Sequence, residues 1–399
     1  VQRNAGGIVA LSDEAKAAGL RKGDGVGAGG RASIAFLREI GSMSLEECRR
    51  RCPGLVVKAM RVERYREAGV AALRVLERWG VPVEKTSYDD FYVDVTSLVR
   101  DAAPPPPDAS LPRTKVVGDA PLATLPADLL SGCMLAVDMR QALLSELGFA
   151  ASAGVGRTKL AARLLSPKAK PDGVLALPEG AARSFFEACP LVSVPSLQGQ
   201  RGRELAKLLA SATGRDLEAE AASGADSLRA ITLGDACALG EARLAGLAGA
   251  MEARKLFEIV AEGGARGSSV TPRGPPKCLA SEASFPPSRD REQLQTQLLE
   301  LSATLWRRLR EDAVEHARWP PKRLIVTWRQ GYSSSPAAGS STSATKGAQH
   351  SRSCPWPSSL SPEPRAASVV PEEMAPAATL ASSAIRLLLD AVGTPKDIT

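Results

Sequence analysis

Histidine is scarce in this chain, which contains two among 399 residues, and its seven cysteines form no Cys-x-x-Cys pair. This composition argues against a structural zinc site, because such sites combine four closely spaced thiolate or imidazole ligands. The cysteine usage favours a reducing compartment. The chain also has no run of about 18 apolar residues and no signal-peptide pattern, so we expect neither membrane insertion nor secretion.

What is present is an ample supply of core-forming residues and a basic charge balance. Apolar residues make up 44% of the chain, which is enough for real hydrophobic cores. A chain of 399 residues is expected to divide into roughly two to four domains. The net charge of +7 allows a polyanionic partner, although a solvated basic surface would give the same number.

Two adjacent carboxylates, Asp89 and Asp90, carry the strongest chemical signal. They stand in the run Ser-Tyr-Asp-Asp-Phe-Tyr-Val-Asp-Val-Thr at residues 87–96, at the mouth of an apolar, β-branched strand. Neighbouring carboxylates repel one another unless a cation compensates them, and oxygen ligands suit Mg²⁺. A surface pair in a turn is the alternative. Because alternate strand residues face opposite ways, the pair can serve one site only at a strand end, and we place it at a hairpin tip.

The run at residues 87–96 resembles the second metal motif of the Y-family DNA polymerases, Ser-x-Asp-Glu-x-Tyr-x-Asp-x-Thr, with Asp90 in place of the family's Glu. Residues 64–68 upstream and residues 152–171 downstream resemble the same family in the same order. Within the family the resemblance is closest to the branch of DNA polymerase eta. It is good over residues 1–265 and faint beyond them.

The resemblance implies DNA-templated nucleotidyl transfer for translesion synthesis past damaged DNA, with two Mg²⁺ ions as cofactors. Asp89 would bridge both ions, and Asp90 would bind the ion on the primer side through an arm one methylene shorter than the family's Glu. We interpret Asp94, which follows in the same run, as structural. The catalytic and metal-binding residues expected from the resemblance are therefore Asp89 and Asp90.

Several cations match positions at which the family binds the nucleotide or the DNA. Lys170 matches the lysine that binds the triphosphate. Lys16 matches a family Arg on the fingers helix, and Lys22 matches an Arg that leans over the nucleotide base in the eta branch. Both lysines keep the charge but lose the bidentate and stacking geometry, and a solvated helix face is the alternative for both. Asp13 stands where the eta branch has a phosphate-binding Tyr, and a carboxylate there would repel the triphosphate. Arg163 replaces a lysine that touches the primer backbone.

Residues 197–206 resemble a helix-hairpin-helix of the polymerase thumb. In that device glycines let backbone N–H groups approach a nucleic-acid phosphate at a helix start, where the helix dipole favours the anion. We assign Gly199, Arg201 and Gly202 to DNA binding on this basis. An ordinary helix-loop-helix is the alternative.

The first residue is Val1, and the apolar strand that precedes this position in a Y-family palm is missing from the sequence. In the family that strand carries a further metal-binding Asp. We therefore expect a truncated chain of low or absent activity.

The expected fold class is α+β, a right-hand polymerase with a palm of mixed sheet and helices. The palm takes residues 1–11 and 45–180. Residues 103–127 form a Pro-rich insertion in it, which we expect to be a loop because proline resists helix and central strand. Apolar residues at helical spacing predict palm helices over residues 65–79 and 129–147.

The remaining domains follow the family order. Residues 12–44 are expected to form small fingers with a Gly-rich insertion, and residues 181–268 a helical thumb. A C-terminal little finger takes residues 269–395, with an amphipathic helix over 290–316. Its segment at about 333–376 is rich in Ser, Ala and Pro and is expected to be disordered in part.

By the resemblance, the partners are primed template DNA and a dNTP, with the sliding clamp added by resemblance only. We expect a monomer in the nucleus. A Tyr-x-Asp-Asp pair also occurs in reverse transcriptases, but the block from Lys159 to Pro171 and the glycine hairpin argue against that class. A non-catalytic polymerase relic that binds primed DNA is the other alternative.

Overall fold

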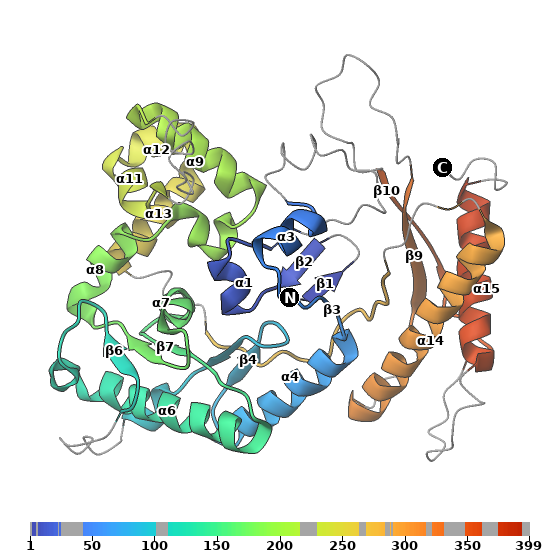
Figure 1. Ribbon diagram of the computed structural model, residues 1–399, viewed down its shortest axis with the longest axis horizontal. Coiled ribbons are helices and arrows are strands. Elements are labelled where there is room, and N and C mark those ends of the chain that lie inside the picture. The colour runs from blue at the N-terminus through green and yellow to red at the C-terminus, as the bar shows by residue number, and fades with distance from the viewer. Residues whose placement is uncertain are drawn as a thin grey trace. The chain divides into compact units, whose positions relative to one another are not determined.

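The structure is a computed structural model that describes residues 2–4, 7–22, 24, 43–100, 111–215, 230–262, 269–283, 288, 290–316, 321–330, 348–360 and 374–392 (Figure 1). The chain divides into two compact units. One comprises Val1–Arg61 and Gly274–Thr399, and the other comprises Val62–Arg273. We call them the split unit and the central unit.

The central unit begins with helix α4 (Val62–Glu77) and an antiparallel hairpin of β4 (Val83–Lys85) and β5 (Phe91–Val93). Helix α6 (Ala127–Leu147) packs with α4 against this hairpin (Figure 1). The shared core contains residues from both helices and from β4: Ala72, Val75, Leu76, Val83, Met139 and Leu143. Both palm helices expected from apolar periodicity are confirmed.

A second, parallel sheet follows, in the order β6 (Thr114–Val116), β8 (Val174–Ala176), β7 (Ala153–Val155). Strand β6 corrects the expectation of a loop over residues 103–127. The reason is that no proline interrupts residues 113–120, so the β-branched run there can pair with β8. Residues 101–110, with the proline run, lie outside the described residues.

Short elements complete the half of the central unit that contains the two sheets. They are α5 (Thr96–Arg100), η1 (Leu122–Thr124), α7 (Lys159–Leu165) and η2 (Ser166–Ala169). The Thr158 hydroxyl begins α7 by accepting a hydrogen bond from the backbone N–H of Ala161 at 3.1 Å.

The other half of the central unit is helical, as expected for residues 181–268. It comprises α8 (Glu179–Glu187), η3 (Leu191–Ser193), η4 (Pro195–Leu197), α9 (Gln200–Thr213), α11 (Leu233–Ala238), α12 (Glu241–Ala248) and α13 (Ala250–Glu262). Leucines with no exposed surface, such as Leu209, Leu233 and Leu256, form one core that joins these helices. Residues 216–229 lie outside the described part.

The N-terminal part of the split unit is a small sheet in the order β2 (Gly7–Ala10), β1 (Gln2–Asn4), β3 (Lys58–Ala59), with helices α1 (Asp13–Ala17) and α3 (Leu45–Arg51). Its core gathers Ile8, Ala15, Leu20 and Cys48. The buried carboxylate of Asp24 accepts hydrogen bonds from the backbone N–H groups of Arg21 at 2.6 Å and Met43 at 2.9 Å. Most of the Gly-rich insertion lies outside the described residues.

The C-terminal part of the split unit packs α14 (Arg291–His316) and α15 (Met374–Val392) on the antiparallel pair β9 (Arg323–Gln330) and β10 (Ala348–Pro355). Strand β10 lies inside the segment at about 333–376 expected to be disordered in part, and most of the rest of that segment lies outside the described residues. The sequence of β10, Ala-Gln-His-Ser-Arg-Ser-Cys-Pro, lacks apolar alternation, so only the pairing with β9 reveals it.

Helices pack on small sheets in both units, and the α+β class is confirmed. None of the helices that the structure describes is long and apolar enough to cross a membrane.

Candidate active site

The two neighbouring aspartates lie in the turn of the β4–β5 hairpin. The register pairs Val83 with Val93 and Lys85 with Phe91, which leaves residues 86–90 as the turn. Its base closes through hydrogen bonds to the Asp90 carbonyl oxygen from the Thr86 backbone N–H at 2.9 Å and hydroxyl at 3.1 Å. The expected position of the pair at a hairpin tip is confirmed. Its metal-binding role stays a prediction.

The hydroxyl of Ser87 organises the turn. It accepts hydrogen bonds from the backbone N–H groups of Asp89 at 3.3 Å and Asp90 at 3.1 Å, and it donates to Asp89 Oδ1 at 2.8 Å. Both aspartates are exposed to solvent. The two carboxylates therefore project from a turn that is held by hydrogen bonds. They are exposed to solvent, where a hard cation can reach them.

Gly69 lets the hairpin approach helix α4 closely. A Cβ atom at this position would lie 2.4 Å from the Tyr88 carbonyl oxygen and 2.8 Å from Lys85 Nζ. Real Cβ atoms essentially never come this close to another heavy atom, so a side chain here would push the aspartate turn away.

Arg163, on α7, is the cation that the structure brings to the aspartates. Its Nη1 lies 4.0 Å from Asp90 Oδ2, and the Asp90 side chain is 61% exposed. At this distance, and with the Asp90 side chain in contact with water, the attraction between the two charges is weak. The residue expected to touch the primer backbone thus lies beside the carboxylate expected to bind the primer-side metal.

The donor chemistry fits a divalent cation in part. Ionised aspartate oxygens are hard ligands of the kind that Mg²⁺ prefers. Within the described ranges, however, no three Asp, Glu, His or Cys side chains gather into a metal-binding group. Asp89 and Asp90 would therefore share the ion with water, with substrate oxygens or with residues outside those ranges.

Glu84, on the edge of the same hairpin, is a partly buried acid that sequence reasoning missed. Its Oε2 accepts hydrogen bonds from Lys159 Nζ at 2.6 Å and from the Thr271 backbone N–H at 2.9 Å. Burial alone would raise the pKa of Glu84, but these hydrogen bonds and the charges of Lys159 and Arg273 outweigh it and lower that pKa. The ammonium group of Lys159 also lies 4.8 Å from the ring centroid of Tyr92.

Lys170 follows η2 directly and is exposed. No contact between Lys170 and either aspartate occurs in the part of the chain that the structure describes. Their convergence on one nucleotide stays a prediction.

The fingers cations lie in the split unit. Lys16 Nζ pairs with Asp13 Oδ1 at 2.6 Å, and both side chains are more than half exposed. The carboxylate expected to repel a triphosphate therefore neutralises the neighbouring lysine. Lys22 is exposed in a turn.

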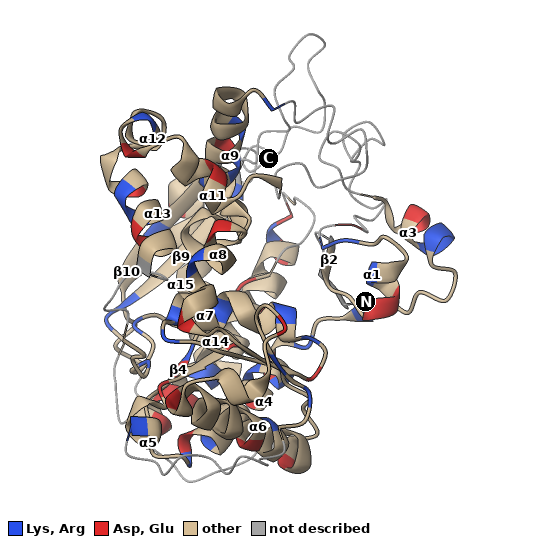
Figure 2. Ribbon diagram, turned by 90° about the vertical axis from the view of Figure 1, so that its left-hand side faces the viewer, with Lys and Arg blue, Asp and Glu red and all other residues tan. Residues whose placement is uncertain are grey.

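The thumb hairpin has the expected backbone geometry. Gly199 is the N-cap of α9 and leaves the helix start without a side-chain cap. A Cβ on Gly202 would lie 1.7 Å from the Leu197 carbonyl oxygen, so only glycine fits this turn. Arg201 forms an ion pair of 3.0 Å with Glu252 on α13. Figure 2 shows basic and acidic residues interspersed over these helices, so the helix start itself is the candidate phosphate contact.

Comparison with known proteins gives the family. A family model described as impB/mucB/samB matches residues 40–167, which include the aspartate hairpin, α6 and α7. DNA polymerase iota of Homo sapiens is 28% identical over 326 residues, which cover 79% of this chain and 39% of that protein. A solved Y-family DNA polymerase chimera of Dbh and Dpo4 superimposes with a TM-score of 0.56 at 15% identity, over 98% of this chain and 84% of the other. The chain is thus similar to Y-family DNA polymerases in sequence, and it shares their fold.

These matches confirm the resemblance to Y-family polymerases, and the solved structure confirms the right-hand polymerase fold. DNA polymerase eta of Arabidopsis thaliana also matches, at 26% identity over 350 residues, 78% of this chain and 46% of that protein. Since both iota and eta match at similar identity, the narrower assignment to the eta branch is a weak detail. The chain spans about two fifths of the length of these relatives, 39% and 46%.

Proposed function

We propose that this Y-family chain carries out DNA-templated nucleotidyl transfer in translesion synthesis. The single observation that supports this most is the tied turn that presents Asp89 and Asp90 within the segment matched by the family model. The fold is that of a polymerase, and the carboxylate pair provides ligands for the catalytic ions.

In this proposal Asp89 and Asp90 hold two Mg²⁺ ions. When bound, such ions activate the primer 3′-hydroxyl and hold the triphosphate during in-line displacement. Asp89 would be the ligand shared by the two ions, and the Ser87 hydroxyl already orients its Oδ1. Asp90 would hold the ion on the primer side, and the guanidinium group of Arg163 lies 4.0 Å from its carboxylate.

Cationic side chains then bind the triphosphate, whose leaving pyrophosphate gains charge in the transition state. Lys170 is assigned this role, with Lys16 and Lys22 as further nucleotide-binding residues from the fingers. Lys16 must exchange Asp13 for phosphate to act in this way. Gly199, Gly202 and Arg201 contact the phosphate backbone of the DNA.

The partners in this proposal are primed template DNA and a dNTP. Binding to a sliding clamp, a monomeric state and residence in the nucleus are inferred from the eukaryotic relatives. Matching relatives also include DNA polymerase IV of bacteria, so a nucleus is not a requirement of the family.

Primer extension by the chain as given, on undamaged and lesion-containing templates, tests the proposal. Asp89→Asn and Asp90→Asn are expected to lower extension at least about a hundredfold, the upper end of what loss of a group supporting a metal site costs. Primed-DNA binding and folding should be unchanged. The matched control is Asp94→Asn, because Asp94 Oδ1 only accepts a hydrogen bond from the Thr96 backbone N–H and Asn keeps that acceptor.

Three outcomes separate the alternatives. Tight binding of primed DNA with no extension, even by a version that also carries the apolar strand with its aspartate, would favour the non-catalytic relic. Preference for an RNA template would favour the reverse-transcriptase class. Extension that survives both aspartate substitutions would refute the assigned site.

A further inference from the structure

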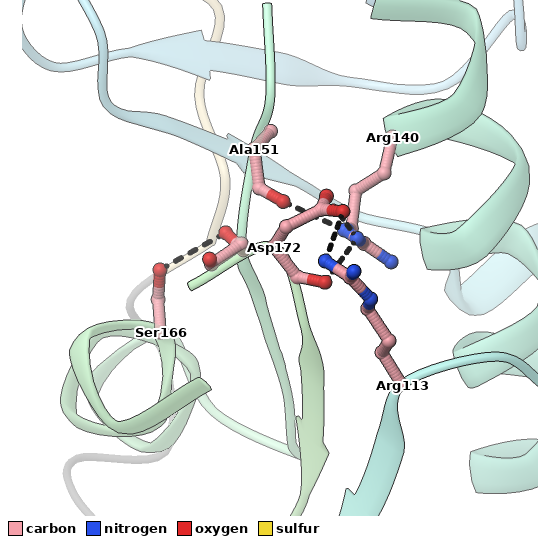
Figure 3. Close-up of polar contacts among 6 residues, drawn as sticks. Arg113, Arg140, Ala151, Ser166 and Asp172 are labelled. Atoms are coloured by element: carbon pink, nitrogen blue, oxygen red, sulfur yellow. Dashed lines mark hydrogen bonds and ion pairs between the residues drawn. The ribbon is translucent and has the colours of Figure 1, made fainter. Parts of the chain in front are cut away.

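A buried arginine on α6 ties together three segments of the central unit. Arg140 has a side chain that is 10% exposed. Its Nε donates to the Ala151 carbonyl oxygen at 2.7 Å, and its Nη2 donates to the Asp172 carbonyl oxygen at 2.6 Å and to the Asp172 carboxylate. Arg113 Nη1 donates to the other carboxylate oxygen of Asp172 at 2.8 Å. Figure 3 shows both arginines pointing at Asp172.

Packing of the core alone does not require this set of directed hydrogen bonds and ion pairs. A buried ion pair contributes little net stability compared with well-packed apolar residues, because both charges must leave water. What a planar guanidinium with several fixed donors does supply is a defined geometry between the groups that it joins. Here those groups are helix α6, the chain just before β7 and the loop just before β8.

The loop so held is the one that carries Lys170. Asp172, two residues on, has a φ of 44°, a left-handed conformation that a non-glycine residue adopts only when its surroundings impose it. Next to it, a Cβ on Gly173 would lie 2.5 Å from the Ala169 carbonyl oxygen. The backbone on both sides of Lys170 therefore follows one fixed path, while the Lys170 side chain is exposed.

We propose that Arg140 and Asp172 are positioning residues, which hold the Lys170 backbone so that its ammonium group meets the triphosphate of the incoming nucleotide. The inference rests on the proposed role of Lys170. Arg140 touches no substrate in this account. It acts through the loop, because a displacement of about 1 Å at a binding group can cost a large factor in rate or affinity.

The test measures nucleotide affinity without turnover. The chain is bound to a primed template whose primer ends in a dideoxynucleotide, and a dNTP is titrated with a divalent cation present. Arg140→Lys, which keeps the charge and loses the fork, is expected to weaken dNTP binding about tenfold, a typical cost for loss of a supporting hydrogen-bonding group. Asp172→Asn should weaken dNTP binding in the same direction and serves if Arg140→Lys fails to fold. Affinity for the primed DNA should be unchanged in both.

The control is Arg78→Lys, which alters another arginine–carboxylate ion pair of the central unit. Arg78 Nη2 lies 2.5 Å from Glu146 Oε1, and both side chains are about half exposed, 53% and 44%. This variant should bind dNTP as the unsubstituted chain does. A loss equal to that of Arg140→Lys would show a general effect on folding and overturn the inference.

A double-mutant cycle with Lys170→Ala separates this inference from the proposed function. If Arg140 acts through Lys170, Arg140→Lys should cause no further loss once Lys170 is alanine. If Lys170→Ala weakens dNTP binding but the two effects multiply independently, the positioning role is wrong and the proposed function stands. If Lys170→Ala leaves dNTP binding unchanged, the role of Lys170 and the inference fail together.

Discussion

At the scale of single residues, the two glycines of the thumb hairpin differ in how much room they have. A Cβ on Gly202 would lie within 3 Å of three backbone atoms of Leu197, whereas a Cβ on Gly199 would meet nothing within 4 Å. Gly202→Ala should therefore lower the free energy of unfolding by about 1–3 kcal/mol, as overpacking does. The control Gly199→Ala should cost less than about 1 kcal/mol, because it changes only a helix cap. Denaturant titration of both variants measures this, and equal losses would contradict the hairpin geometry.

The cysteines offer a second prediction at the residue scale. Burial raises the pKa of Cys133 to about 12, so its reactive thiolate is nearly absent at neutral pH. Cys278 is exposed. A maleimide should therefore label Cys278 in the native chain and Cys133 only after denaturation, as measured by mass spectrometry of peptides. Rapid native labelling of Cys133 would show that α6 is not packed as described.

At the scale of elements, Glu84 couples the aspartate hairpin to residues far along the chain. The pKa of Glu84 is lower in the folded chain than the ordinary glutamate value of 4.5. The ion pair with Lys159 therefore stabilises the fold fully above pH 4.5. This stabilisation is lost as the pH falls through the lower pKa of the folded state. Glu84→Gln should cost about 1–3 kcal/mol near neutral pH, because it leaves Lys159 largely buried without its counter-charge.

The pH dependence is the decisive readout for Glu84. The difference in unfolding free energy between the unsubstituted chain and Glu84→Gln should shrink as pH falls below 4.5. The control Glu146→Gln removes an exposed pair with Arg78 and should cost less than about 1 kcal/mol. A difference that grew toward acid pH would reverse the assigned direction of the shift.

The sequence predicted those elements whose apolar residues recur at one regular spacing. Helices α4, α6 and α14 follow from apolar spacing, and the hairpin position of Asp89 and Asp90 follows from the alternation of strand residues. Strand β10 was not predicted, because its sequence shows no alternation of apolar and polar residues and only its pairing with β9 defines it.

The contacts around the site could not be predicted in the same way, because they join distant residues. The Glu84–Thr271 hydrogen bond spans 187 residues and the Arg140–Asp172 contact spans 32. One signal was available. Arg140 shares helical spacing with the buried residues Cys133 and Leu143 on α6, and a charge on an apolar face requires a partner.

At the scale of the whole molecule, the candidate DNA contacts are of a kind that neutralises phosphate without reading bases. The net charge is +7, and Figure 2 shows Lys and Arg as well as Asp and Glu on the described helices. The contact proposed at Gly199 is a helix start rather than a side chain aimed at a base edge. We therefore expect DNA affinity to depend strongly on salt and weakly on sequence.

Equilibrium binding of two primed duplexes of equal length and unrelated sequence checks this expectation. Raising salt from about 50 to about 200 mM should weaken both complexes at least about tenfold, because each neutralised phosphate releases condensed counterions. The ratio of the two affinities should stay near one at every salt concentration, since phosphate contacts carry no sequence information. A preference of more than about tenfold for one duplex, retained at high salt, would require direct base contacts. Such contacts would be incompatible with a polymerase that accepts any template.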